Sequence, residues 1–74
     1  METNDEEMNY ERAKVFSKEK IKVHISKTNG VFYNGIITKV EPDYFFLIDE
    51  EDGEQLVFFV ELAIPIKRYV EEGE

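Results

Sequence analysis

The fold is decided by the stretch Gly30-Val31-Phe32-Tyr33-Asn34-Gly35-Ile36-Ile37-Thr38-Lys39-Val40. The dipeptide Asn29-Gly30 at its start supplies the positive φ angles that a tight hairpin turn requires. The residues that follow continue as one long alternating strand that reaches Glu41. Gly35 lies inside this strand, where a glycine weakens a flat sheet and usually marks a sharp bend or a close backbone approach. The stretch therefore predicts a hairpin and a long strand that bends at Gly35.

Four more strands are predicted around this one, at residues 20–26, 44–49, 55–60 and 64–70. The breaks between them contain Pro42-Asp43 and Asp52-Gly53, which are typical turn sequences. Structural roles are expected for three glycines, namely Gly30, Gly35 and Gly53. Apolar residues between Asn9 and Phe16 predict a short N-terminal helix of one or two turns. We expect a mainly all-β protein in which five strongly bent antiparallel strands close into a small SH3-like barrel.

Length and composition limit the chain to one small domain. It has 74 residues, a mass of 8.8 kDa and 42% hydrophobic residues, which suffice for one core. We expect this domain at residues 12–70, between acidic flexible tails at residues 1–11 and 71–74. The absence of cysteine excludes disulfides, and a single histidine cannot form a metal site alone. The acidic start and the lack of a long apolar run predict a cytoplasmic protein with no membrane partner.

Charge is distributed unevenly along the chain, whose formal net charge is −8. Residues 1–11 carry only acids, residues 12–39 carry seven basic residues against one acid, and residues 40–74 carry eleven acids against two bases. One interpretation is an ordinary solvated surface. The other is self-complementarity, in which the basic edge of one subunit faces the acidic edge of the next and favours a head-to-tail ring.

The strands at residues 44–49 and 55–60 are apolar on both faces, so each needs cover on both sides. The outward-facing apolar residues are expected to be Phe45, Leu47, Val57 and Phe59. Either the sheet bends enough to bury both faces, or these strands pair with another subunit. The second alternative predicts a homo-oligomer joined through edge strands. Its interface residues would be Leu47, Val57, Phe59, Ile64 and Ile66.

The strand order and the glycine-bearing stretch resemble the Sm and Sm-like family, which includes bacterial Hfq. The matching elements are Gly30, Phe32, Gly35, Ile37, Val40, the turn Glu41-Pro42-Asp43 and the strand from Tyr44 to Ile48. The resemblance covers about residues 20–69 and implies an Sm-like barrel. It also implies a ring of roughly six or seven subunits, in which the fourth strand pairs with the fifth strand of the next subunit and RNA is held around the pore.

The RNA-contacting positions of that family are not matched in this chain. Sm proteins have an asparagine in the third strand just after the turn, and Phe45 stands at that position here. An Arg-Gly pair in Sm proteins, or a Lys-His pair in Hfq, follows the fourth strand, where this chain has Val60-Glu61. A glutamate near the pore would repel phosphate. The resemblance therefore supports the fold more strongly than the family's binding site.

Candidate RNA contacts come from two kinds of side chain. The lysines that could form a phosphate-holding stripe across the first two strands are Lys20, Lys22, Lys27 and Lys39. The alternative is that these lysines form only the solvent face of those strands. The aromatic residues that could stack on unpaired bases are Tyr33, Tyr44 and Phe45. The alternative for these three is a place in the core or in a subunit interface.

The sequence contains no recognisable motif for catalysis. Ser17 and Ser26 have no acid–base partner in a known pattern, and no glycine-rich phosphate loop is found. His24 is expected to be a surface or hydrogen-bonded imidazole rather than a metal ligand. We therefore expect a protein that is not an enzyme and has no cofactor, metal or small-molecule substrate.

Two functions are left open by these observations. The first is a ring-forming Sm-like module in RNA binding or RNA–protein assembly, with atypical contact residues. The second is a protein-interaction or scaffold module on the same barrel with no nucleic-acid role, which the acidic net charge favours.

Overall fold

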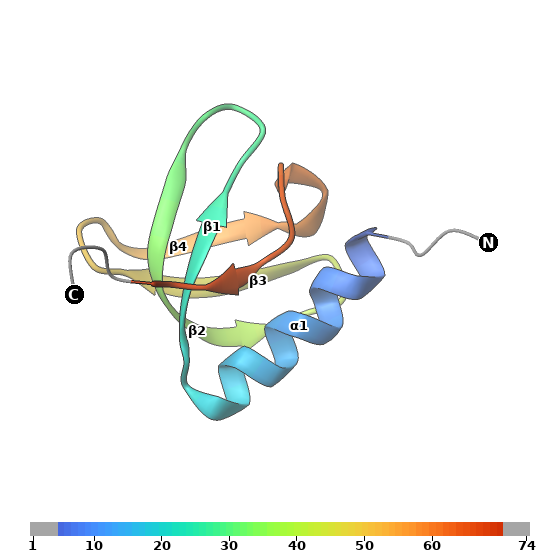
Figure 1. The fold of residues 1–74 in the computed structure, drawn as a ribbon, viewed down its shortest axis with the longest axis horizontal. Helices are drawn as coiled ribbons and strands as arrows, with labels where there is room; N and C mark the ends of the chain where they lie inside the picture. Colours follow the sequence, from blue (N-terminus) through green and yellow to red (C-terminus); the bar gives the residue numbers. More distant parts are fainter. Residues whose placement is uncertain (1–4, 71–74) are drawn as a thin grey trace.

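The structure is a computed structural model that describes residues 5–70. One helix is followed by five antiparallel strands of a single sheet, which confirms the mainly β prediction (Figure 1). In chain order the elements are α1 (Asp5–Glu19), β1 (Lys22–Ser26), β2 (Phe32–Val40), β3 (Tyr44–Asp49), β4 (Gly53–Phe58), the short 3-10 helix η1 (Phe59–Glu61) and β5 (Lys67–Arg68). The order across the sheet is β4-β3-β2-β1-β5, so β4 and β5 are its edges. Closure into a barrel stays a prediction.

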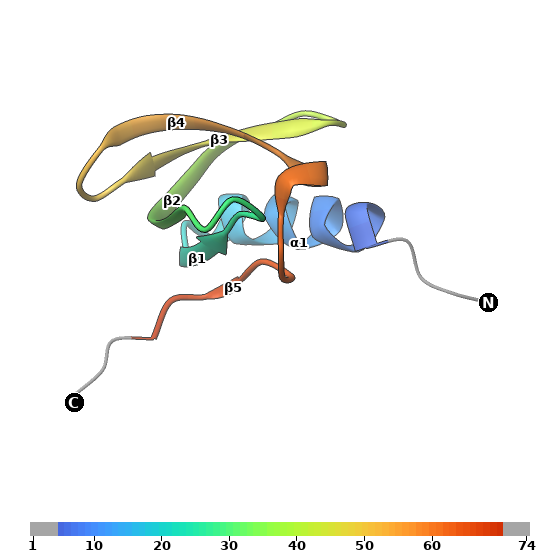
Figure 2. The same ribbon diagram turned by 90° about the horizontal axis from the view of Figure 1, so that it is seen from above.

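Gly35 lies in the paired part of β2 and β3, opposite Asp49. A Cβ atom at this position would lie 1.9 Å from the backbone oxygen of Ile48, which is far inside van der Waals contact. Of the two roles expected for Gly35, the close backbone approach is therefore confirmed, whereas the register irregularity of β2 lies between Ile37 and Lys39. Gly30 and Gly53 have φ angles of 90° and 77°, as their turns require. Figure 2 shows the sheet curling, with β4 and β5 on opposite sides of β1 and β2.

The core lies between α1 and one face of the sheet. Its buried side chains are Ala13, Val23, Ile25, Ile37, Phe45, Leu47, Val57, Phe59 and Ile66. Four of the five predicted interface residues belong to it and are at most 3% exposed, namely Leu47, Val57, Phe59 and Ile66. Their assignment to a subunit interface is wrong, because they pack with one another inside the core, to which α1 contributes Ala13, Tyr10 and Phe16. Ile64 is 39% exposed, and its place in an interface stays a prediction.

Helix α1 is longer than predicted, and tertiary contacts explain its length. Its apolar residues form only a weak stripe, so the sequence pattern gives little helical signal. Ala13 is fully buried against the sheet. Asn9 is also buried, and its Oδ1 accepts a hydrogen bond of 2.9 Å from the backbone N–H of Ile66. Arg12 Nη1 donates a hydrogen bond of 3.1 Å to the carbonyl oxygen of Ile66. These contacts attach the helix to the segment before β5.

The predicted tails need one correction. Residues 5–11 form the first part of α1, so the prediction of a flexible tail at residues 1–11 is wrong for them. Residues 1–4 and the predicted tail at residues 71–74 lie outside the described residues. Neither helical segment of residues 5–70 has both the length and the apolar character that crossing a bilayer requires.

Candidate nucleic-acid interface

The predicted lysine stripe is broken into separate ion pairs. Lys27 Nζ lies 3.6 Å from Glu61 Oε1, and Lys39 Nζ lies 3.4 Å from Glu41 Oε2. Because each carboxylate offsets the charge of its lysine, these two residues contribute little positive potential. Lys20 lies apart from the strands, directly after the C-terminal end of α1. The structure therefore does not bring the predicted lysines together as one phosphate-holding surface.

Lys22, at the start of β1, connects three parts of the fold. Its Nζ lies 2.5 Å from Glu50 Oε1, in the turn after β3. The same ammonium stands 4.3 Å from the centroid of the Tyr69 ring, directly after β5. A cation over an aromatic face is attracted by the ring quadrupole. Lys22 therefore positions Tyr69 against β1.

The three predicted stacking residues have different environments. Phe45 is fully buried and packs on Phe59 with ring centroids 5.2 Å apart, so its prediction as an RNA contact is wrong. Tyr33 is half-buried against the core, and its hydroxyl donates to Gln55 Oε1 at 3.3 Å. Tyr44 is half-buried beside the ring of Phe58. Base stacking by either tyrosine stays a prediction.

Apolar side chains of β2, β3 and β4 also point away from the core, and we name this surface the outer apolar face. It consists of Ile36, Tyr44, Phe46, Ile48, Leu56 and Phe58. Ile48, Leu56 and Phe58 are 44%, 41% and 42% exposed. The prediction that Phe45, Leu47, Val57 and Phe59 face outward is therefore wrong, because all four are buried in the core. Because both faces of β3 and β4 are apolar, the alternation of side chains along these strands does not predict which face points into the core.

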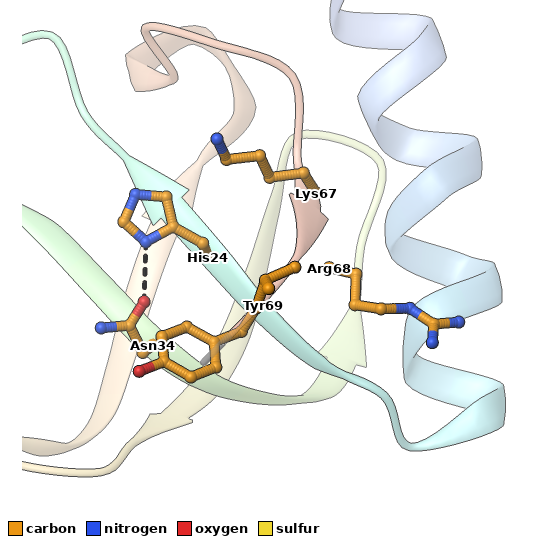
Figure 3. A pocket seen from close by; sticks show the side chains of 6 residues that line it. His24, Asn34, Lys67, Arg68 and Tyr69 are labelled. Carbon is orange, nitrogen blue, oxygen red and sulfur yellow. Dashed lines mark hydrogen bonds between the residues drawn. The ribbon is translucent and has the colours of Figure 1, made fainter. Parts of the chain in front are cut away.

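A pocket of about 340 Å³ opens where β1 lies between β2 and β5 (Figure 3). Its lining residues are His24, Asn34, Lys67, Arg68, Tyr69 and Val70. The sheet register brings them together, because His24 pairs with Asn34 on β2 and with Lys67 on β5. His24 Nδ1–H donates to Asn34 Oδ1 at 2.7 Å, which confirms the prediction of a hydrogen-bonded imidazole. Among residues 5–70, no carboxylate lines this pocket.

The buried carboxylate of Asp49 binds the backbone of Asn34, a residue that lines the pocket. Its Oδ1 accepts a hydrogen bond from the Asn34 N–H at 2.8 Å, and its Oδ2 accepts from the N–H groups of Glu51 and Asp52. Burial alone would raise the pKa of Asp49. The backbone N–H groups of Asp52, Asn34 and Glu51, together with the charge of Lys22, bring this pKa below its usual value. The carboxylate therefore stays ionised and fixes both the β3–β4 turn and the neighbouring part of β2.

Phe32 stands beside the pocket at the start of β2. It is 61% exposed, and its ring centroid lies 5.9 Å from that of His24. A second depression of about 180 Å³ adjoins it and is lined by Phe32, Asn34, Asp49, Glu50, Glu51 and Asp52. Across residues 5–70, no group of three histidine, aspartate or glutamate side chains is arranged to hold a metal ion. The two depressions therefore have opposite charge and share Asn34 between them.

The pocket residues are absent from the predicted RNA contacts. The Asn29-Gly30 signal alone does not give this pairing, because a two-residue loop would place His24 opposite Gly35, whereas the observed loop of residues 28–30 places it opposite Asn34. No local pattern places Lys67 and Tyr69 beside β1, since that contact joins distant parts of the chain. No protein-family model and no curated protein matches the chain. Functional assignment therefore depends on the geometry of these residues.

Proposed function

We propose that this protein is a non-enzymatic Sm-like module that assembles head to tail into a ring and binds RNA. The observation that carries the proposal is the strand order β4-β3-β2-β1-β5 with a close β2–β3 approach at Gly35. This arrangement leaves β4 and β5 as edges with backbone groups available for another chain. A ring follows when one edge of each subunit pairs with the other edge of the next.

The charges of the two edges support this assembly. Glu54 lies exposed on β4, whereas β5 consists of Lys67 and Arg68, which are also exposed. Among residues 5–70, neither Lys67 nor Arg68 has a carboxylate within ion-pair distance. Pairing β4 with the β5 of a neighbour would bring opposite charges together and favour one direction of association.

The RNA part of the proposal is supported by the basic pocket beside β5. Proteins that hold single strands combine positive groups for phosphates with aromatic faces for bases. Lys67, Arg68 and Tyr69 supply both kinds of group within three consecutive residues. Acidic side chains line the neighbouring depression at the β3–β4 turn and not this pocket. A local positive surface of this kind can bind phosphate despite a net charge of −8.

Fluorescence anisotropy with short labelled U-rich and A-rich RNAs at low salt tests this function. We expect binding that weakens steeply with salt, because phosphate contacts release counterions. Absence of binding at tens of micromolar subunit would overturn the RNA part of the proposal.

The outer apolar face favours a second candidate, a protein-interaction module with no nucleic-acid role. Exposed apolar patches on small proteins commonly mark interaction sites. Under this alternative, no RNA binds, and Phe58→Glu changes the oligomeric mass measured by light scattering, because it places a charge at the centre of a protein contact. RNA binding that is unchanged in Phe58→Glu would exclude the outer apolar face as the RNA site.

A further inference from the structure

We propose that the pocket between β1, β2 and β5 is a subsite for one nucleotide of a single RNA strand. In this subsite Lys67 contacts the phosphate, the His24–Asn34 pair meets the polar edge of the base, and Phe32 supports its face. The inference rests on the proposed RNA binding and adds where, and through which groups, the strand is held.

Lys67 is the cation best placed to meet a phosphate in the pocket. Its side chain extends toward His24, whereas the guanidinium of Arg68 lies on the side of α1 (Figure 3). Within residues 5–70, Lys67 has no ion-pair partner, in contrast to Lys22, Lys27 and Lys39. A cation with no carboxylate beside it in its own subunit attracts an anion even in a chain of net charge −8.

The His24–Asn34 pair presents polar atoms that the fold does not use. His24 Nδ1–H and Asn34 Oδ1 bind each other at 2.7 Å, which orients both side chains. In the described part of the chain, His24 Nε2 and Asn34 Nδ2 have no hydrogen-bond partner. One is an acceptor in the neutral imidazole and the other is a donor. The edges of a nucleobase carry a partner for each of these two atoms.

Phe32 supplies the apolar face that a base needs. It is 61% exposed although it lies on a strand, and its one ring neighbour among residues 5–70 is His24. Tyr69 lines the same pocket, with Lys22 over one face of its ring. Base–aromatic stacking is sequence-tolerant and contributes strongly to single-strand binding. The exposed Phe32 ring explains why a nucleotide fits the site better than an acidic peptide, whose carboxylates would use only Lys67.

The test compares RNA affinities of the full chain and four variants across a range of salt concentrations. Phe32→Ala and Lys67→Gln change the subsite. Ile48→Ala removes apolar surface from the outer apolar face, and Lys14→Gln removes one charge from α1. Circular dichroism and light scattering check the fold and the oligomeric mass of each variant, because Lys67 also lies on the β5 edge, and affinities are compared between proteins of equal mass.

Each subsite variant has its own expected signature. Phe32→Ala should weaken binding about fivefold or more at every salt concentration, since it removes stacking and no charge. Lys67→Gln should weaken binding at low salt and make the slope of log affinity against log salt shallower by about 0.7, the value for one phosphate contact on a single strand. Ile48→Ala and Lys14→Gln should bind within about twofold of wild type.

The outcomes separate this inference from the proposed function. If wild type binds RNA and both subsite variants bind equally well, the subsite is wrong and RNA binding stands. If wild type binds no RNA, the proposed function fails and the subsite falls with it. If Phe32→Ala and Lys67→Gln instead abolish binding of an acidic peptide to a chain that ignores RNA, the pocket is a protein site.

Discussion

At the scale of single residues, Gly35 and Asp49 have the clearest physical roles. Both lie where β2 meets β3, and they pair with each other. Gly35 allows the two backbones to approach, and the Asp49 carboxylate accepts hydrogen bonds from one backbone N–H of β2 and two of the β3–β4 turn. Close approach and satisfied polar groups together hold the β2–β3 pair beside the candidate pocket.

Gly35→Ala should destabilise the protein by about 3 kcal/mol or more, because backbone must move to admit the Cβ atom. Gly53→Ala is the matched control, since its added Cβ meets nothing within 4 Å and only its φ of 77° is unfavourable. That control should cost about 1–2 kcal/mol. Urea unfolding followed by circular dichroism measures both. Equal losses would show that the contact at Ile48 is readily relieved.

Asp49→Asn should lower the free energy of unfolding at pH 7 by about 2 kcal/mol, because charge-assisted hydrogen bonds are weakened. The folded-state pKa of Asp49 is lowered, so its stabilising effect is present above its unfolded pKa of about 4 and is lost as pH falls through the folded value. The difference between wild type and variant should therefore shrink at low pH. Urea unfolding at pH 7 and at pH 3 measures this, with the exposed Asp52→Asn as control. A difference that stays constant with pH would contradict the role of the Asp49 charge.

At the scale of elements, the C-terminal end of α1 contains a strained backbone conformation at Lys20. The N–H of Lys20 donates to the Ser17 carbonyl, and the N–H of Ile21 donates to the Phe16 carbonyl, which is the pattern of a helix ended by a left-handed residue. Lys20 occupies that left-handed position with a φ of 56°. Glycine is the residue that adopts this conformation without steric cost.

Lys20→Gly should therefore stabilise the protein by about 1 kcal/mol, because it relieves the left-handed strain. Lys18→Gly, inside the last turn of the same helix, should destabilise it by about 1 kcal/mol. The shifts in melting temperature should have opposite signs. If both glycines destabilise, the strain at Lys20 is offset by contacts of its own side chain.

At the scale of the whole molecule, the two sheet edges predict the assembly. Wild type should have a light-scattering mass several times 8.8 kDa. Reversing the charge of β5 with Lys67→Glu and Arg68→Glu should lower that mass, because β5 would then repel the acidic β4 edge of its neighbour. Adding Glu54→Lys to the double variant should restore association in part. A strict monomer for wild type at high concentration would contradict the ring.

The sequence by itself determined the first four strands, their turns and the need for glycine at position 35, because alternation and turn chemistry act between near neighbours. Of the last strand, predicted at residues 64–70, the structure has only Lys67–Arg68. Only the tertiary structure decided which face of β3 and β4 is buried, since both faces are apolar and α1 selects one of them. The candidate pocket also depends on the tertiary structure. Its basic residues come from β5, and only the completed sheet brings that strand beside β1.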